Sequence, residues 1–516
     1  MSNLINKIDF ALNKQSLFVV AVSILCLTLI GIPLLYLPAV SINPDTYQYL
    51  SIANYYLMDP APTLRDAYTV GPVIPVLIAI LKYILSWFIA WNRHVDVFML
   101  KGMALICYLV IVISTGIHLK KSLPPIVVLT FLLLLMGLPD WECDSLSLNG
   151  ELLSVGLMAL LLTHLGRSDR EPNIIIVCFL AVLVIYTKLQ SALLLFLLLA
   201  SYYYPKKERW TALLILFGSF IVIDLVLYAN GTGVFRRVTD LLMYVNRTNP
   251  SPGMLTNNQG TFHEVGLSRY IVNLQWSVMW VQKFAPLFGF MVGYFVLTNQ
   301  NRSGGILTDW RVWLFVLFVT IMTPGRQYGH YTIYALFFVI IFAEPVLSSL
   351  TDGATKQGAI SLISLAIIVG FLAVKTSNSV TSIAESKLWL GPDIEAAASL
   401  TKQGGGRVHI HGYDYRLYTY FYGWNDGTDL SYVAGGSADP SWYLNRVLDK
   451  KYKYIVDVVG YSGRINDPLY KITDSTIYGV TLAKYYELVT NSNGLRVFRL
   501  KVAAQNSILP EHSTLN

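Results

Sequence analysis

Charged side chains are scarce in this sequence. They make up 13% of its 516 residues, whereas hydrophobic side chains make up 54% and the mean hydropathy is +0.52. A single soluble core cannot bury so large an apolar fraction, so the composition excludes an ordinary water-soluble globular protein and predicts that lipid covers most of the chain. The windows 17–37, 189–204 and 357–374 contain no charged residue. Each is close to the roughly 20 residues that a helix needs to cross a bilayer.

Cysteines, sequence repeats and basic aromatic stretches are also scarce or missing. The four cysteines lie in or next to apolar stretches, at Cys26, Cys107, Cys143 and Cys178. They imply neither a disulfide framework nor a CxxC metal site. The chain lacks an internal repeat of roughly 20 to 50 residues and a low-complexity tract. No basic stretch alternates with aromatic residues, so the net charge of +7 does not indicate nucleic-acid binding.

What the sequence does contain is a series of apolar stretches separated by polar breaks, which predicts a polytopic α-helical membrane protein with about eleven transmembrane helices. The predicted spans are 17–37, 95–117, 124–138, 149–166, 173–187, 190–204, 210–229, 272–297, 310–323, 331–350 and 358–374. Basic residues gather in alternate short loops, at Lys7, Lys14, Lys120, Lys121, Arg167, Arg170, Lys206, Lys207, Arg209, Arg302 and Lys356. By the positive-inside rule the N-terminus is cytoplasmic and the C-terminus is exported.

The predicted organisation has two domains. Residues 1–375 form the transmembrane domain, with long outside loops at 42–93 and 230–270, and residues 376–516 form a soluble extracytoplasmic α/β domain. Strand-like runs at 407–411, 452–459 and 495–502 alternate there with helical patterns such as 442–449. The domain is dense in tyrosine, which suits stacking on sugar rings but equally suits a membrane-interface belt or core packing.

The first outside loop opens with a predicted helix at 45–57. With Asp45 as N-cap, four residues share one apolar face: Tyr49, Ile52, Ala53 and Tyr56. Such an amphipathic helix would lie along the membrane surface. Asp45 is either a helix cap and nothing more, or a carboxylate that takes part in chemistry. A second apolar segment follows and ends near Trp91, as another surface helix or a short span.

The second outside loop is rich in acids. Asp140, Glu142 and Asp144 fall within five residues, and Glu151 follows at the start of the fourth span. These acids either are solvated and mark the outside surface, or form a carboxylate pair with Asp45 for acid–base or metal chemistry.

Cationic residues stand at two outer turns. Lys188 lies between the fifth and sixth spans with 16 charge-free residues on either side, and either extends to the interface or binds an anion. Arg326, His330 and Tyr331 occupy the turn before the tenth span. Either His330 is structural, as a lone His in a turn usually is, or an Arg and a His beside a Lys hold a phosphate. Asp224, inside the seventh span, is costly in lipid and is expected to face protein or water.

The order of these features resembles the GT-C superfamily of membrane glycosyltransferases, which use polyprenyl-phosphate sugars. The likeness is greatest to the lipid A aminoarabinose transferases, the protein O-mannosyltransferases and the bacterial serotype-converting glucosyltransferases. The matching pieces are the helix from Asp45 to Leu57, the run from Gly71 to Leu77, Glu151, Thr187 with Lys188, the turn with Arg326, His330 and Tyr331, and the closing hairpin from Tyr485 to Phe498.

The resemblance implies a reaction and roles for these residues. An acceptor hydroxyl attacks the anomeric carbon of a lipid-linked sugar outside the membrane, in an inverting displacement. The catalytic candidates are Asp45, Glu142 and Asp144. The phosphate- or donor-binding candidates are Arg65, Lys188, Arg326, His330 and Tyr331. The acceptor-side or supporting candidates are Tyr49, Asp140, Glu151, Asp224 and His263.

The expected partners are a polyprenyl-phosphate-linked sugar donor, an acceptor that is a glycan, a lipid or a protein, and the bilayer. A divalent metal cation is a cofactor that only some families of the superfamily use. The expected location is the bacterial inner membrane. Two other interpretations remain open at this point: a transporter or flippase of lipid-linked sugars, and a binding or assembly protein whose Tyr-rich domain holds a polysaccharide.

Overall fold

The structure is a computed structural model that divides the chain into two compact units. One unit comprises 1–59, 63–246 and 273–386, and the other comprises 60–62, 247–272 and 387–516. The residues that it describes are 11–31, 34, 44–57, 71–90, 93–136, 148–166, 172–203, 209–229, 256–257, 260–261, 289–294, 309–322, 333–351, 392–411, 422–424, 426–428, 452–458 and 483–502.

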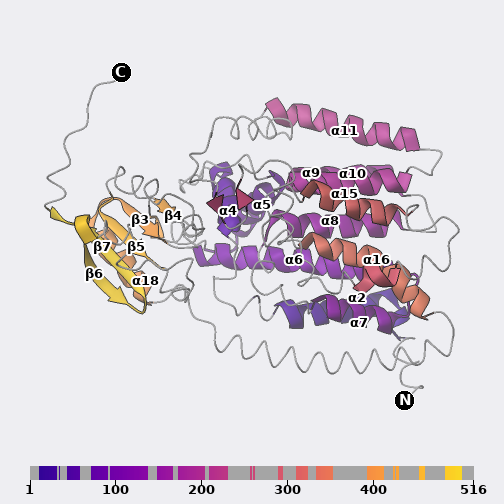
Figure 1. Ribbon diagram of the computed structural model, residues 1–516, viewed down its shortest axis with the longest axis horizontal. Helices are drawn as coiled ribbons and strands as arrows, with labels where there is room; N and C mark the ends of the chain where they lie inside the picture. The colour runs from indigo at the N-terminus through magenta and orange to yellow at the C-terminus, as the bar shows by residue number, and fades with distance from the viewer. Residues whose placement is uncertain are drawn as a thin grey trace, which may run out of the picture. The chain divides into compact units, whose positions relative to one another are not determined.

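The first unit is helical (Figure 1). Its elements are α2 (Gln15–Cys26), the π-helix η1 (Leu27–Gly31), α4 (Pro44–Tyr56), α5 (Val73–Leu85), α6 (Arg93–Leu119), α7 (Pro125–Met136), α8 (Gly150–Leu165), α9 (Ile174–Thr187), α10 (Leu189–Tyr203), α11 (Arg209–Ala229), α15 (Trp310–Met322) and α16 (Tyr334–Thr351). Helices thus form at every predicted span from the first to the seventh, and at 310–323 and 331–350. The predicted span 358–374, and all of 272–297 except 289–294, lie outside the described residues.

Two neighbouring helices start where an asparagine provides a cap. The Asn149 side chain accepts a hydrogen bond from the backbone N–H of Leu152 at the start of α8, and that of Asn173 accepts one from Ile175 at the start of α9. These caps satisfy backbone donors that a helix start leaves unpaired. They explain why the predicted starts at 149 and 173 fall within one residue of the observed ones.

Helices α6 and α8 pack closely along the helical unit. Gly156 lies against the Cys107 carbonyl. About two helical turns further along both helices, the Thr163 hydroxyl donates to the Ser114 carbonyl at 2.8 Å. Both contacts join residues that are 49 positions apart, so the two helices run parallel. The long helices lie side by side, and the shorter α4 and α5 lie at one end of them (Figure 1).

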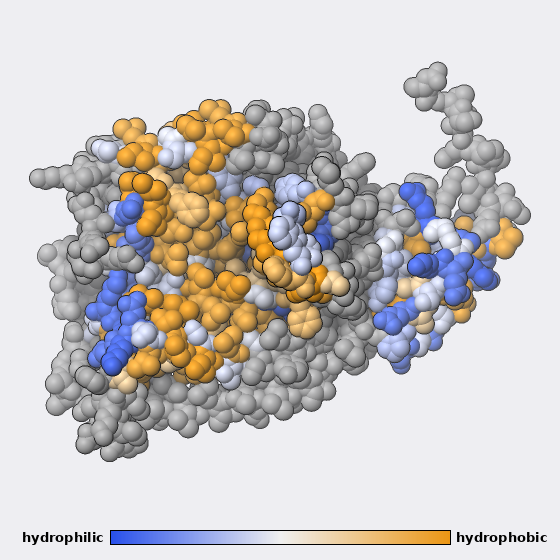
Figure 2. Space-filling model, turned by 180° about the vertical axis from the view of Figure 1, so that it is seen from behind, coloured by the Kyte–Doolittle hydropathy of each residue, from blue (hydrophilic) through white to orange (hydrophobic). Residues whose placement is uncertain are grey.

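The surface of the helical unit is strongly apolar. Figure 2 shows hydrophobic side chains over the visible face of this unit, with hydrophilic ones gathered near one edge. Among the described residues, one helix, Val95–Leu119, is long and apolar enough to cross a bilayer, and shorter apolar helices accompany it. Large exposed apolar side chains include Val20, Trp87, Phe88, Ile175, Phe179 and Phe217.

The second unit holds a five-stranded mixed sheet and a helix. The elements are α18 (Pro392–Gly404), β3 (Val408–His411), β4 (Asp426–Thr428), β5 (Tyr454–Asp457), β6 (Tyr486–Ser492) and β7 (Leu495–Leu500), in strand order β4-β3-β5-β7-β6. β3 pairs in parallel with β4 and β5, and β7 pairs antiparallel with β5 and β6. A separate two-stranded ladder joins β1 (Thr256–Asn257) to β2 (Gly260–Thr261). Strands therefore form at the three predicted runs, while 442–449 lies outside the described residues.

The β6–β7 hairpin turns through Asn493 and Gly494, which have φ angles of 49° and 86°. Two consecutive residues with positive φ match the right-handed twist of a two-residue hairpin, which is why Asn-Gly is favoured there. Ser492 and Asn493 also donate hydrogen bonds to Asp393 on α18. These hydrogen bonds lower the pKa of Asp393, because they stabilise its ionised form.

Candidate active site at the helix ends

The start of α4 packs against the start of α8. The Thr46 hydroxyl donates to the Leu148 carbonyl at 2.7 Å, and the Gly150 backbone N–H donates to the Tyr49 hydroxyl at 3.3 Å. Both hydrogen bonds are buried and join residues about 100 positions apart. The first outside loop and the start of the fourth predicted span therefore meet, as the predicted site requires.

Helix α4 forms where the sequence predicts it, but two details of the prediction are wrong. It begins at Pro44, so Asp45 lies in its first turn and not at the N-cap. Proline is favoured at the first helical position because it has no N–H to leave unpaired. The buried side also differs from the predicted apolar face, since Tyr56 is exposed. The buried residues are Thr46, Tyr47, Tyr49, Leu50, Ala53 and Asn54.

The buried side of α4 differs from the predicted face because two of its polar residues form hydrogen bonds. Thr46 and Asn54 are buried because each finds a hydrogen-bond partner on another helix or its cap. A polar group can be buried at little cost when it is hydrogen-bonded. Apolar periodicity alone cannot reveal such partners. It therefore identified Tyr49 and Ala53 on the buried side but missed Thr46 and Asn54.

A buried ion pair lies beside this contact. The Lys188 ammonium is 2.8 Å from a Glu151 carboxylate oxygen, and the two side chains are 11% and 0% exposed. Glu151 lies in the first turn of α8, where the helix dipole favours an anion. Lys188 is the one non-helical residue between α9 and α10, and its side chain also packs against Gly150. The two candidates, placed 37 positions apart, thus form one charged element.

The starts of α5 and α16 also contact the segment around Lys188. A Cβ on Gly71, just before α5, would lie only 2.0 Å from the Tyr186 carbonyl oxygen and 2.4 Å from that of Thr187. Only glycine fits so close to the backbone. On another side, the hydroxyls of Ser191 and Tyr334 are 2.6 Å apart, which joins the start of α10 to the start of α16.

These contacts define the helix-end cluster, which comprises Thr46, Tyr49, Gly71, Gly150, Glu151, Lys188, Ser191 and Tyr334. It gathers the starts of five helices, α4, α5, α8, α10 and α16, and the end of α9. Tyr334 follows Tyr331 by three residues, so the segment that holds the predicted phosphate ligands leads directly into it. Arg326, His330 and Tyr331 themselves lie outside the described residues.

Three polar residues next to the cluster were missing from the predicted site. The Lys82 ammonium on α5 donates to the Asn54 side chain at 2.7 Å and lies 3.4 Å from the Asp96 carboxylate on α6. All three residues are buried. A charge inside an apolar segment is itself a signal of function, and Lys82 lies in one such segment. Lys101, also buried, carries the same signal in α6.

Asp224 is fully buried on α11, in agreement with the expectation that it faces protein or water. It accepts a hydrogen bond from the Tyr186 hydroxyl at 2.7 Å. An apolar cavity of about 290 Å³ lies among the same two helices, α9 and α11, and α10. Its lining includes Ile185, Leu195, Phe196 and Phe220. The lining residue Ile185 precedes Lys188 by three residues in the sequence.

The remaining predicted site residues lie outside the described residues. They are Arg65, Asp140, Glu142, Asp144 and His263. For Asp45 the structure describes the backbone position in α4. In the described part of the chain, no group of three or more His, Cys, Asp or Glu residues is placed to hold a metal ion.

Comparison with known proteins identifies the fold. No protein-family model and no curated protein sequence matches the chain. Solved structures do match, and the two described next each have a TM-score of 0.54 and 12% identity. ArnT from Cupriavidus metallidurans bound to undecaprenyl phosphate aligns over 96% of this chain and 99% of its own. The Archaeoglobus fulgidus oligosaccharyltransferase, in complex with Zn and sulfate, aligns over 94% and 73%.

A third structure, the archaeal oligosaccharyltransferase AglB from Archaeoglobus fulgidus with an inhibitory peptide and a dolichol-phosphate, matches at 10% identity and a TM-score of 0.51 over 95% of this chain and 74% of its own. These proteins are polytopic membrane glycosyltransferases of the GT-C type. The resemblance inferred from the sequence motifs is therefore confirmed for the fold.

Proposed function

We propose that this protein is a membrane glycosyltransferase that moves a sugar from a polyprenyl-phosphate donor to a hydroxyl of a cell-envelope glycan, lipid or protein, by inverting displacement. The observation that carries the proposal is the helix-end cluster, where the start of the Asp45 helix meets the buried Glu151–Lys188 pair. The fold supports it, because ArnT was solved with undecaprenyl phosphate and AglB with a dolichol-phosphate.

Asp45 is the proposed general base. Its backbone lies in the first turn of α4, next to Thr46, which contacts the start of α8. In an inverting displacement a carboxylate takes the proton of the acceptor hydroxyl as that oxygen attacks the anomeric carbon. Glu142 and Asp144 are further candidates for acid–base or metal chemistry from the loop that leads to Leu148. Asp140, Tyr49 and His263 are proposed on the acceptor side.

Cations are proposed to stabilise the leaving lipid phosphate. Charge grows on this phosphate as the glycosidic bond breaks, and preorganised cations lower the barrier. Glu151 holds Lys188 in place at the helix-end cluster. Arg65, Arg326, His330 and Tyr331 are the other proposed ligands. The apolar cavity among α9, α10 and α11 offers a surface for the isoprenoid chain, and its lining residue Ile185 precedes Lys188 by three residues.

The proposed location is the inner membrane of a bacterium, with the helix-end cluster at the extracytoplasmic face. Residues 1–375 then form the membrane domain and 376–516 the extracytoplasmic α/β domain. The charge distribution supports this orientation. Lys120 and Lys121 follow α6, and Lys121 contacts the opposite end of α8 from Glu151. Short basic loops of this kind stay in the cytoplasm.

The test is sugar transfer by the purified full chain in detergent. Polyprenyl-phosphate donors with radiolabelled sugars are incubated with envelope glycan, lipid A and hydroxyl-bearing peptide, and labelled acceptor is measured. We expect Asp45→Asn to lose about 100-fold or more in rate, with unchanged detergent gel filtration. Glu395→Gln, which removes an exposed carboxylate on α18, is the matched control and should transfer like the wild type.

Three results would contradict the proposal. Full activity of Asp45→Asn would reject this base. An equal loss in Glu395→Gln would show a general effect of charge removal. Movement of labelled donor across liposome membranes without any labelled acceptor would identify a flippase instead.

A further inference from the structure

Lys82 joins three helices through contacts inside the helical unit. Its ammonium donates to Asn54 Oδ1 on α4 at 2.7 Å and lies 3.4 Å from Asp96 Oδ1 on α6. Asn54 and Asp96 are each 1% exposed and Lys82 is 8% exposed. A long charged side chain is buried in this way only when its charge and donors are matched, which the two oxygens achieve.

The helix that Lys82 holds is the one that carries Asp45. Described long-range hydrogen bonds attach α4 to its surroundings at Thr46, at Tyr49 and at Asn54. The first two bonds fix the start of the helix and the third fixes its last turn. The buried side of α4 also contains Tyr47, Tyr49 and Leu50. Their packing is not directional, so the three hydrogen bonds are what define the orientation of the helix about its axis.

Helix α5, which carries Lys82, is also connected to the part of the helix-end cluster that contains Lys188. It has 13 residues and is roughly 20 Å long. Gly71, just before its start, lies against the carbonyls of Tyr186 and Thr187, adjacent to Lys188. One short helix therefore contacts the end of α9 near its own start and the last turn of α4 near its own end.

We infer that Lys82 is a positioning residue: through Asn54 it fixes α4, and with it Asp45, relative to Lys188, and Asp96 compensates its charge. This inference rests on the proposed function for its effect on turnover. It does not make Lys82 a phosphate ligand, because its ammonium is engaged between Asn54 and Asp96 inside the helical unit.

Loss of a positioning residue and loss of a substrate-binding residue affect different kinetic constants. A base that is misplaced by about 1 Å can cost on the order of 100-fold in rate, even when the substrate still binds. A lost phosphate ligand would instead raise KM for the donor. The separation of kcat from KM therefore discriminates between them.

The experiment changes Asn54, because replacement of Lys82 would leave Asp96 buried without its cation. Asn54→Leu removes the acceptor, and Asn54→Asp keeps an acceptor oxygen for Lys82. Tyr56→Phe, at an exposed position of the same helix, is the matched control. We expect Asn54→Leu to lower kcat by about 10- to 100-fold with the donor KM within about twofold. Asn54→Asp and Tyr56→Phe should stay within about threefold of wild type.

Hydrogen–deuterium exchange of the same full-length proteins gives a readout that needs no activity. In Asn54→Leu the amides of 45–57 should exchange faster, while those of 153–165 in α8 should not change. Wild-type exchange in Asn54→Leu, or an Asn54→Asp variant as impaired as Asn54→Leu, would overturn the inference. A raised donor KM with normal kcat would overturn it in favour of substrate binding. Faster exchange together with a wild type that transfers no sugar would support the attachment of α4 by Lys82 and reject the proposed function.

Discussion

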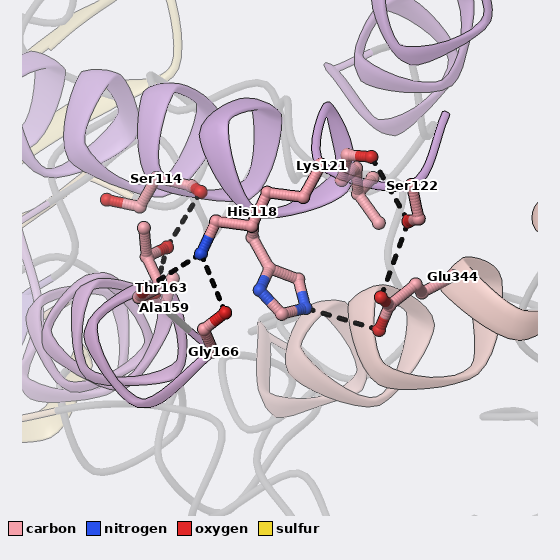
Figure 3. A network of polar contacts seen from close by, with 9 residues as sticks. Ser114, His118, Lys121, Ser122, Ala159, Thr163, Gly166 and Glu344 are labelled. Atoms are coloured by element: carbon pink, nitrogen blue, oxygen red, sulfur yellow. Dashed lines mark hydrogen bonds and ion pairs between the residues drawn. The ribbon is translucent and has the colours of Figure 1, made fainter. Parts of the chain in front are cut away.

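The two ends of α8 carry two different charged arrangements. At its start, Glu151 is paired with Lys188 at 2.8 Å, and the carboxylate is fully buried. At its other end, Lys121 donates to the carbonyls of Gly166 and Thr163, and His118 lies 3.3 Å from Glu344, whose side chain is 29% exposed (Figure 3). The Ser122 hydroxyl also donates to Glu344 at 3.4 Å.

The difference lies in what each arrangement contributes to the helix. Lys121 caps carbonyls that the end of α8 leaves unpaired, and its charge suits the negative end of the helix dipole. The start of α8 is already capped by Asn149, so Glu151 is not needed for that purpose. An ion pair with a fully buried carboxylate, beyond the needs of capping, is costly to build. This cost favours a functional origin for the Glu151–Lys188 pair and a structural one for the network at the other end.

The largest expected effect comes from breaking the Glu151–Lys188 pair. Lys188→Met leaves Glu151 buried without its cation, which should lower the free energy of unfolding by about 3–5 kcal/mol. The double variant Glu151→Met, Lys188→Met should regain most of this stability because no unpaired charge remains. It should still fail to transfer sugar, because the cation is missing. Thermal unfolding in detergent and the transfer assay measure the two properties.

Two results would contradict this prediction. A double variant as unstable as Lys188→Met would mean that the two side chains do not compensate each other. A stable double variant with wild-type transfer would mean that the pair is structural, like the network at the other end of α8.

A smaller effect is expected from Gly71→Ala, which tests how tightly α5 is seated at the same end. The new methyl group would collide with backbone carbonyl oxygens of Tyr186 and Thr187, which cannot rotate away. We expect a loss of about 3 kcal/mol, at the upper end of the usual cost of overpacking, and a loss of transfer. The matched control is Gly102→Ala in α6, where no neighbouring atom lies within 4 Å. That change should stabilise the helix by about 0.5–1 kcal/mol.

Equal melting temperatures of Gly71→Ala and Gly102→Ala would show that α5 can move away from α9 freely. The geometry of the helix-end cluster would then not depend on this contact.

The elements that the sequence predicts well are those set by neighbouring residues. Helices α8, α9 and α11 match the predicted spans 149–166, 173–187 and 210–229 within about two residues, because apolar runs and capping asparagines mark their bounds. The β6–β7 hairpin is likewise marked by its own Asn493-Gly494 turn. Such signals are complete within a short stretch of chain.

The site was predicted less completely, because its parts are joined by contacts between distant residues. Glu151 and Lys188 were both selected, but nothing in the sequence pairs them with each other. Lys82 and Asp96 were passed over, because a charge near the end of an apolar segment resembles one that extends to the interface. The burial of Asn54 beside Lys82 depends on how α4 and α5 pack, which no local pattern records.

The smallest effect is expected at the far end of α8, in the His118–Glu344 contact. His118→Phe removes one hydrogen bond to a partly exposed carboxylate and should lower the free energy of unfolding by about 1 kcal/mol. Glu344→Gln keeps an acceptor oxygen and should cost less. Because this contact is a full helix length from Lys188, both variants should keep wild-type kcat and donor KM per folded molecule. A loss of transfer greater than the loss of folded protein would show that the two ends of α8 are coupled, and the structural assignment of this network would then be wrong.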